Sequence, residues 1–352
     1  MGRVAGRSAA RRRAPANSPY NWASYDSAVS AARAHGLRVE LSLSGPAPAW
    51  ATGNRRFGPM QPNATKFGQF ATAVAQHFKG KVDRYAIWNE PNYPSWLAPQ
   101  STAPQQYRKL YTAAYKAIKA VDVQDQVLIG ETVPFAATPK ATAPLAFLRG
   151  VFCNGCAPLQ ADGFAHHPYD FDHAPNYRYP GPDNVTIGTL GRLTSYLDDL
   201  GRRKLLTTPD GTPMPLYLTE FGYFASGKRA FPVAKRSKYL VQAFQIAARN
   251  PRVRELVQYL LVEPPPKFPF NTGLVTPAGS TLAPFTGLAS WAQTAIKAGR
   301  AASPSTSPKP PTTTTPTTTT PTTTTPTTTT PTSTTPTTTT APPSGTGGAS
   351  PG

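Results

Sequence analysis

The chain has little cysteine, little acidic charge and no long apolar run. Its two cysteines lack histidine partners, which excludes a zinc site built on them. No stretch reaches the roughly 20 apolar residues of a membrane-spanning helix, so we expect no membrane span. The arginines near the N-terminus are not followed by an apolar core, so this segment is not a complete signal peptide.

The scarcity of acidic residues leaves the chain strongly basic. It has 17 Asp and Glu against 36 Lys and Arg, a formal net charge of +19. Arginines are concentrated in residues 1–13, and the other basic residues are scattered along segments that we expect to be helical. A nucleic-acid-binding protein gathers basic residues on one face, together with aromatic or groove-reading elements. The scattered charge therefore indicates solvated helix faces and no nucleic-acid partner.

The two cysteines, Cys153 and Cys156, are spaced as Cys-Asn-Gly-Cys. A redox motif of this spacing lies where a strand leads into a helix of a thioredoxin-like unit. Here the pair follows a helix-like segment, 143–151, and precedes a strand. We therefore expect a structural disulfide of the kind found in exported proteins, with free thiols as the alternative.

Three regions differ in composition. Residues 1–19 are rich in Arg, Ala and Pro, and we predict that they are disordered. Residues 20–300 alternate between helical and apolar segments and form the predicted folded domain. In residues 301–352, Pro recurs every five residues from Pro311 to Pro336, separated almost entirely by Thr. Such a tail cannot bury a core, so we predict an extended spacer outside the cytoplasm, either an O-glycosylated stalk or an unmodified linker.

The domain shows regular alternation of predicted helices and strands. Helical spacing of apolar residues predicts helices at 22–35, 66–78, 104–121, 145–152, 187–202, 234–250 and 284–298. Short apolar runs predict strands at 37–43, 82–88, 126–130, 163–167, 216–220 and 256–262. Apolar strands bounded by helices are typical of a parallel sheet covered on its outer face.

Two of the predicted strands end in a glutamate. The first motif is Trp88–Asn89–Glu90–Pro91–Asn92, and the second is Thr219–Glu220–Phe221–Gly222. Pro91 stops the first strand and keeps Glu90 at its end. Catalytic residues of parallel (β/α) barrels lie at the carboxyl ends of strands, and a pair of carboxylates is what glycoside hydrolysis requires. We therefore predict one pocket that holds both glutamates.

Together, the two motifs resemble the retaining glycoside hydrolase clan, and its xylosidase-type and cellulase-type families in particular. The resemblance extends from about Tyr20 to about Thr294. It implies a (β/α)8 barrel with the acid/base on the fourth strand and the nucleophile on the seventh. The resemblance therefore assigns Glu90 as acid/base and Glu220 as nucleophile, whereas the residues alone identify the pair without allocating the roles.

The strand count does not match that of the clan. Glu90 lies on the second predicted strand instead of the fourth, so the first two strands of the barrel are missing from the count. Either the chain begins late or it forms an open barrel, and the missing signal peptide at the same end favours a late start. We predict an α/β fold of the TIM-barrel type, N-terminally incomplete, with about six βα units and unpaired edge strands.

The resemblance also suggests residues that bind the substrate. Asn89 would donate its amide to a sugar hydroxyl, His167 would line the mouth, and Tyr169 would hold the nucleophile; a purely structural role is the alternative. Neighbouring histidines point apart, which disfavours a metal site. Flat apolar rings match the C–H face of a sugar, so Trp50 and Trp96, which follow strand ends, are candidate platforms unless they pack in the core.

Glu131 and Glu263 also lie at predicted strand ends, and we expect them to bond substrate hydroxyls or to support the site. The predicted protein is a secreted or cell-surface O-glycoside hydrolase that acts as a monomer on a polysaccharide or glycoside, with neither a metal nor an organic cofactor. Two other functions remain open. One is a carbohydrate-binding pseudoenzyme in which the missing strands abolish turnover, and the other is a cell-surface structural protein defined by its stalk.

Overall fold

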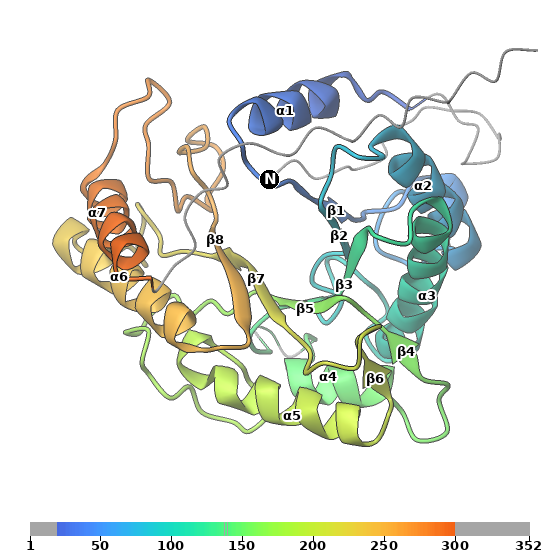
Figure 1. Ribbon diagram of the computed structural model, residues 1–352. Coiled ribbons are helices and arrows are strands. Elements are labelled where there is room, and N and C mark those ends of the chain that lie inside the picture. The colour runs from blue at the N-terminus through green and yellow to red at the C-terminus, as the bar shows by residue number, and fades with distance from the viewer. Residues whose placement is uncertain (1–19, 137, 139, 300–352) are drawn as a thin grey trace, which may run out of the picture. The chain divides into compact units, whose positions relative to one another are not determined.

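Six strands form one parallel sheet in the computed structural model, which describes residues 20–136, 138 and 140–299 (Figure 1). The strand order is β1-β2-β3-β5-β7-β8, and every neighbouring pair is parallel. The bounds are β1 (Glu40–Leu43), β2 (Arg84–Ile87), β3 (Gln126–Thr132), β5 (Gly163–His166), β7 (Leu216–Phe221) and β8 (Val253–Gln258). The sheet curves as part of a barrel whose edge strands, β1 and β8, do not pair with each other. This architecture confirms the predicted incomplete (β/α)8 barrel. The predicted disordered N-terminus, 1–19, and the predicted tail, 301–352, lie outside the described residues.

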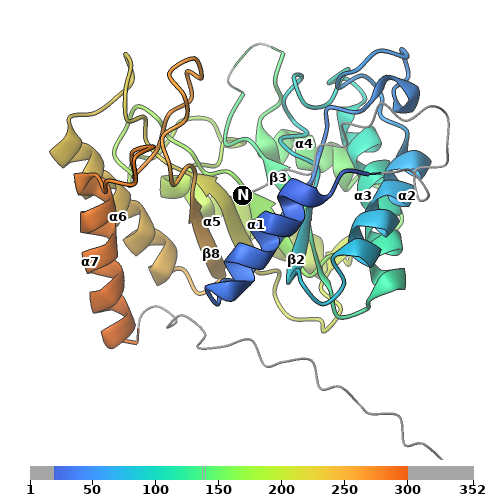
Figure 2. The same cartoon turned by 90° about the horizontal axis from the view of Figure 1, so that it is seen from above.

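The first helix precedes the first strand, and the other helices follow strands and lie on the outer side of the sheet (Figures 1 and 2). Their bounds are α1 (Ala23–Ala34), α2 (Ala64–His77), α3 (Ala103–Val121), α4 (Pro144–Val151), α5 (Leu190–Arg202), α6 (Val233–Arg249) and α7 (Ala283–Lys297). Local sequence sets several of the ends. The Asn63 side chain accepts a 3.0 Å hydrogen bond from the Lys66 N–H and caps α2. Gly36 and Gly80, with φ of 69° and 72°, follow α1 and α2 in the left-handed conformation that glycine adopts without strain.

Side chains alternate between the two faces of each strand. In β2, Tyr85 and Ile87 point outward into the main core, which lies between the sheet and the helices. Ala86 points inward, where it meets a small apolar cluster of Leu128, Ala165 and Tyr217 from β3, β5 and β7. This alternation directs the inward residues at the strand ends into the mouth of the barrel.

Charged side chains lie inside the barrel near the N-terminal ends of β1 and β2. Arg84 of β2, which is 5% exposed, forms an ion pair with Glu255 of β8, and its Nη1 is 4.0 Å from Glu40 of β1. The Arg84 guanidinium also lies 4.4 Å from the centre of the Tyr217 ring. A polar layer therefore links strands from opposite edges of the sheet.

Two details differ from the sequence-based expectations. A second, two-stranded sheet pairs β4 (Leu159–Gln160) with β6 (Leu206–Thr207), which are too short to show a pattern. The last strand was predicted at 256–262, whereas β8 spans Val253–Gln258, because its pairing with β7 starts at Val253. The apolar residues beyond it are solvent-exposed, with Leu261 at 56% and Val262 at 46%.

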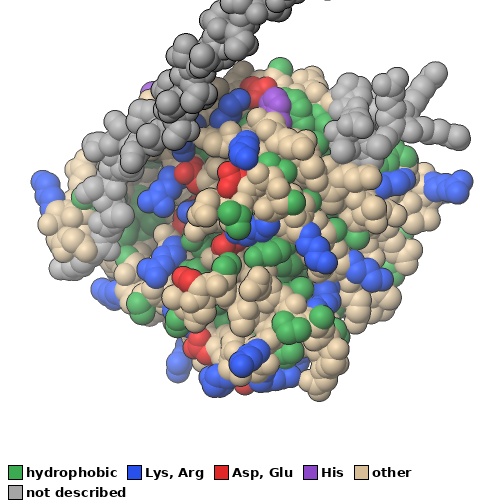
Figure 3. All heavy atoms as spheres, turned by 45° about the vertical axis from the view of Figure 1, so that its right-hand side comes forward, with side chains coloured by type: hydrophobic (Ala, Val, Ile, Leu, Met, Phe, Trp, Pro, Cys, Tyr) green, Lys and Arg blue, Asp and Glu red, His purple; other side chains and the backbone are tan. Residues whose placement is uncertain are grey.

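Other features bear on the sequence-based expectations. The sulfur atoms of Cys153 and Cys156 are bonded in a short loop after α4. Among the described residues, no helix combines the length and the apolar character needed to cross a membrane. On the face shown in Figure 3, Lys and Arg side chains are spread among uncharged ones.

Candidate active site

Strands β2 and β7 bring the two glutamates of the sequence motifs to the same end of the sheet. Glu220 lies within β7, and Glu90 follows β2 after a turn in which Trp88 and Glu90 have φ of 72° and 43°. Glu131, near the end of β3, has φ of 52°. Residues other than glycine rarely adopt positive φ, and those that do cluster at functional sites. The strained backbone at these three residues marks this end of the sheet as a candidate site.

His167, directly after β5, lies between three carboxylates. Its Nδ1 is 3.0 Å from Oε1 of Glu90, and its Nε2 is 2.8 Å from Oε2 of Glu131. The same Nδ1 is 3.8 Å from Oε2 of Glu220. The imidazole is fully buried, so it forms the floor of the site and does not line its mouth as the resemblance implied.

The surroundings of His167 favour its protonated form. Burial alone lowers the pKa of this imidazole, but the negative charges of Glu220 and Glu131 and the hydrogen bonds to Glu131 and Glu90 outweigh it and raise the pKa well above the usual value. An imidazolium has an N–H on both ring nitrogens. In its protonated form His167 donates one hydrogen bond to Glu90 and another to Glu131.

One group of side chains has the spacing of a metal site. An oxygen of Glu90, an oxygen of Glu220 and a ring nitrogen of His167 all lie within 4.8 Å of one another. A histidine that binds a metal must offer a free lone pair, whereas both ring nitrogens of His167 lie at hydrogen-bond distance from carboxylates. The geometry therefore favours a charge network over a metal centre.

Tyr169 holds Glu220 from the other side. Its hydroxyl donates a 3.2 Å hydrogen bond to Oε2 of Glu220, the contact that the resemblance implies. The ring stacks on Phe171 and Phe221, with centroids 4.7 Å and 6.1 Å away. Burial, followed by the charges of Glu220 and Glu90, raises the pKa of Tyr169 well above its usual value. The hydroxyl is therefore a permanent donor to the Glu220 carboxylate.

A cleft of about 370 Å³ opens onto the two glutamates. Apart from Glu90 and Glu220, it is lined by Tyr93, Trp96, Val133, Pro134, Phe135, Tyr169, Phe171, Tyr259 and Phe270. Trp96 was a predicted sugar platform, and the other aromatic residues, Tyr169 apart, were not singled out from the sequence. Most of these aromatic residues could have been found in the sequence, because they lie a few residues after the end of a strand. Aromatic walls around two carboxylates can stack on a sugar ring.

Two further predicted residues lie deeper than the cleft wall. Asn89 is 1% exposed, and its Nδ2 is buried with no hydrogen-bond partner in the described part of the chain. An unpaired buried amide is costly, so this group is available to a ligand. Glu131 is also 1% exposed. Its side chain contacts His167 and is not part of the cleft lining.

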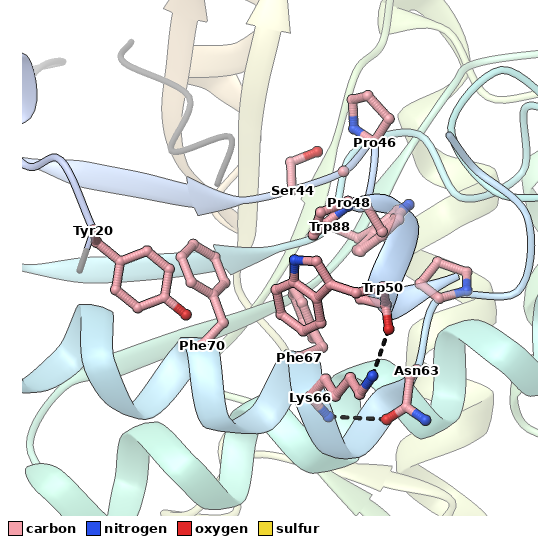
Figure 4. A pocket seen from close by; sticks show the side chains of 14 residues that line it. Tyr20, Ser44, Pro46, Pro48, Trp50, Asn63, Lys66, Phe67, Phe70 and Trp88 are labelled. Atoms are coloured by element: carbon pink, nitrogen blue, oxygen red, sulfur yellow. Dashed lines mark hydrogen bonds between the residues drawn. The ribbon is translucent and has the colours of Figure 1, made fainter. Parts of the chain in front are cut away.

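Trp50 and Glu263 lie away from the paired glutamates. Trp50 lines a separate pocket of about 50 Å³ between the loop after β1 and helix α2, together with Phe67 and Phe70 (Figure 4). Glu263 lies five residues beyond the end of β8, so its predicted place at a strand end is wrong; its Oε1 accepts a 3.1 Å hydrogen bond from Asn271. Contacts of either residue with substrate stay a prediction.

A parallel (β/α) barrel with two glutamates at the carboxyl ends of its strands defines this protein as a member of the retaining glycoside hydrolase clan. The chain belongs to the cellulase family (glycosyl hydrolase family 5), whose family model matches residues 7–247, more than half of its length. None of the curated proteins compared with the chain matches it.

Solved structures share the fold. A family 39 glycoside hydrolase from the gut symbiont Bacteroides cellulosilyticus superposes with a TM-score of 0.61 at 21% identity, covering 79% of this chain and 55% of that one. A glucosidase from Croceicoccus marinus gives 0.54 at 18% identity, covering 79% and 55%. Xylanase 10B from Thermotoga maritima gives 0.53 at 17% identity, covering 79% and 82%. The chain thus spans about half the length of the first two structures.

Proposed function

We propose that the protein hydrolyses O-glycosidic bonds with retention of anomeric configuration, with Glu90 as acid/base and Glu220 as nucleophile. The observation that carries the proposal is the spacing of the pair: an oxygen of Glu90 and an oxygen of Glu220 lie within 4.8 Å of each other. Carboxyl groups of retaining enzymes lie about 5–5.5 Å apart, whereas inverting enzymes separate them by about 6.5–9.5 Å to admit a water. The short spacing supports direct attack by one carboxylate.

The proposed reaction has two steps. In the first, Glu220 attacks the anomeric carbon while Glu90 gives its proton to the departing oxygen, which leaves a glycosyl ester on Glu220. In the second, Glu90 takes a proton from water, the water oxygen attacks the anomeric carbon, and the ester bond to Glu220 breaks. The Tyr169 hydroxyl orients the Glu220 carboxylate for attack.

The cleft suggests how the sugar is bound. Aromatic residues such as Trp96 and Tyr259 offer stacking surfaces beside the carboxylates. The buried Asn89 amide offers a donor for a sugar hydroxyl. Neither step of the proposed reaction calls for a metal or an organic cofactor, and we propose that the protein uses none.

We further propose that the protein works as a monomer outside the cell or at its surface. The Cys153–Cys156 disulfide and the Pro/Thr-rich composition of residues 301–352 support this setting. A tail of this kind would tether the domain near an insoluble polysaccharide.

A panel of chromogenic glycosides and polysaccharides tests the function. Because the neighbouring structures are described as a xylosidase, a glucosidase and a xylanase, the panel starts with aryl β-xylosides, aryl β-glucosides and xylan. We expect turnover in which the product keeps the anomeric configuration of the substrate. NMR of the freshly formed product measures that configuration. Glycan binding without any turnover would instead identify a carbohydrate-binding pseudoenzyme.

A further inference from the structure

Glu131 has no part in the two steps above, yet it is one of the most deeply buried charged residues near them. It is 1% exposed, and its Oε2 accepts a 2.8 Å hydrogen bond from Nε2 of His167. Its other oxygen, Oε1, is buried with no hydrogen-bond partner among residues 20–136, 138 and 140–299. A buried carboxylate is tolerated when a charged partner compensates it, and His167 is that partner.

The opposite side of the same imidazole contacts the proposed acid/base. Nδ1 of His167 is 3.0 Å from Oε1 of Glu90. If His167 were neutral with its proton on Nε2, Nδ1 would present a lone pair to Glu90 and would hold the proton of that carboxyl group. If His167 carries both protons, Nδ1–H donates to Oε1 instead. The protonation of His167 therefore determines which oxygen of Glu90 can carry a transferable proton.

Several groups face His167 from the elements packed around it. Glu90 follows β2, Glu131 lies in β3, and Glu220 lies in β7. The Tyr169 ring meets the imidazole edge-on with centroids 6.4 Å apart. Glu40 in β1 and the adjacent His166 also interact with it electrostatically. Glu131 is the nearest of the carboxylates, and the reaction leaves it unchanged throughout.

We propose that Glu131 is a positioning residue for the acid/base: its carboxylate holds His167 in the doubly protonated form, whose Nδ1–H fixes Oε1 of Glu90 and leaves Oε2 to deliver the proton. The inference rests on the proposed function, because it assumes that Glu90 is the acid/base. During the first step the proton passes from Oε2 to the leaving oxygen, and the hydrogen bond from His167 stabilises the carboxylate that forms. His167 and Glu131 keep their protonation states, so no further co-reactant is needed.

The test replaces the charge of Glu131 with a neutral group of the same shape. In Glu131→Gln, the charge and the hydrogen bond of Glu131 no longer oppose the effect of burial on the His167 pKa. The remaining charge of Glu220 and hydrogen bond to Glu90 should not suffice to offset burial, so His167 should become neutral near pH 7. The ¹⁵N NMR spectrum of the His167 ring should change from that of an imidazolium in the wild type to that of a neutral imidazole. Hydrolysis of an unactivated glycoside should fall about 10-fold or more, since general acid catalysis contributes about 100- to 10,000-fold. An aryl glycoside with a highly acidic leaving group should be affected much less.

Three controls separate this role from a loss of structure. Glu131→Asp keeps the charge and should keep the imidazolium spectrum, even if its turnover falls. Asp199→Asn removes an exposed carboxylate that pairs with Arg202 and Arg203, and should change neither the spectrum nor the rate. If Glu131→Gln does not fold, the wild-type spectrum still decides, because a neutral His167 at pH 7 overturns the proposal.

The outcomes distinguish this inference from the proposed function. An imidazolium spectrum and an unchanged dependence on the leaving group in Glu131→Gln would overturn the inference and leave the hydrolase function intact. Absence of turnover in the wild type on every glycoside tested would overturn the function. The NMR result would then still establish whether Glu131 controls the protonation of His167.

Discussion

The backbone N–H of Glu90 donates a 2.8 Å hydrogen bond to the carbonyl oxygen of Glu131. The turn that carries the first glutamate is thus attached to the neighbouring strand, and Asn92 reinforces the attachment. The Asn92 Oδ1 accepts a 2.9 Å hydrogen bond from the Val133 N–H, and its Nδ2 donates to the Val133 carbonyl at 3.3 Å. The position of Glu90 is therefore set by β3 as much as by β2.

Removal of the proposed nucleophile should abolish turnover. In Glu220→Gly no carboxylate is left to attack the anomeric carbon, and the space of the lost side chain admits a small anion. Added azide should partly restore turnover on an aryl glycoside and yield the glycosyl azide of inverted configuration, which NMR of the product identifies. Near-normal turnover of the variant without azide would show that another group is the nucleophile.

Removal of the proposed acid/base should depend on the leaving group. Glu90→Ala loses the proton donor, so kcat/KM for an unactivated glycoside should fall by about 100-fold or more. A substrate with an acidic phenol as leaving group needs little protonation, and its first step should be nearly unaffected. Equal losses on both kinds of substrate would contradict the role of Glu90 as the acid.

Tyr169→Phe should weaken the nucleophile and leave the fold intact. The variant loses the hydrogen bond to Oε2 of Glu220, and hydrogen bonds to charged groups contribute about 1.5–3 kcal/mol. We expect kcat to fall about 10- to 100-fold. Because the pKa of Tyr169 is raised well above its usual value, the wild-type hydroxyl stays protonated at all working pH values, and the pH profile of kcat should keep its shape. A lost alkaline limb would mean that Tyr169 titrates.

His166 should make the fold sensitive to mild acid. Its Nε2–H donates to the Val185 carbonyl and its Nδ1 accepts from Thr132, and burial lowers its pKa to about 3. In the unfolded chain a histidine titrates near about 6.5. As the pH falls from about 6.5 toward about 3, the unfolded state alone gains this proton, and the free energy of unfolding falls by up to about 1.4 kcal/mol per pH unit.

The His166 contribution can be isolated by urea unfolding between pH 6.5 and 4.5. His166→Gln lacks the titrating group, so its free energy of unfolding should decline less steeply with falling pH than that of the wild type. The slope is informative even if the variant is less stable at every pH. Parallel slopes would refute the contribution of His166.

The predicted tail should be dispensable for catalysis and stability. A chain that ends at Ala302 lacks the Pro/Thr repeats, whose composition cannot bury a core. Its melting temperature and its turnover of a soluble glycoside should match those of the full chain. A drop of several degrees would show that the tail packs on the domain.

The sequence predicted the architecture well because the central strands of this sheet, β2, β3, β5 and β7, are buried on both faces. Strand β3, for example, is a run of buried residues that stands out between two helical patterns. The end of β8 was misplaced because apolar composition does not distinguish a strand from an exposed loop, and Leu261 and Val262 belong to such a loop. The register of pairing with β7, which fixes β8, depends on residues distant in sequence.

The site was predicted in part for a similar reason. Glu90 and Glu220 were identifiable because each lies at the end of an apolar strand, and parallel strands bring their carboxyl ends together. Whether Glu131 supports the site or contacts the substrate could not be decided, since its contact with His167 depends on the inward turn of both side chains after β3 and β5. Trp50 shows the same limit, because a loop after a strand can lead either to the cleft or to another pocket.

The ion pair between Arg84 and Glu255 joins residues that are 171 positions apart. Contacts between residues so far apart in sequence slow folding, because the entropy of closing the loop is lost before the contact can stabilise the fold. During synthesis, β1 and β2 emerge well before β8. The ion pair of Arg84 with Glu255 can therefore form only after most of the domain has been synthesised. The first half of this sheet therefore reaches its final electrostatic state only when the last strand is added.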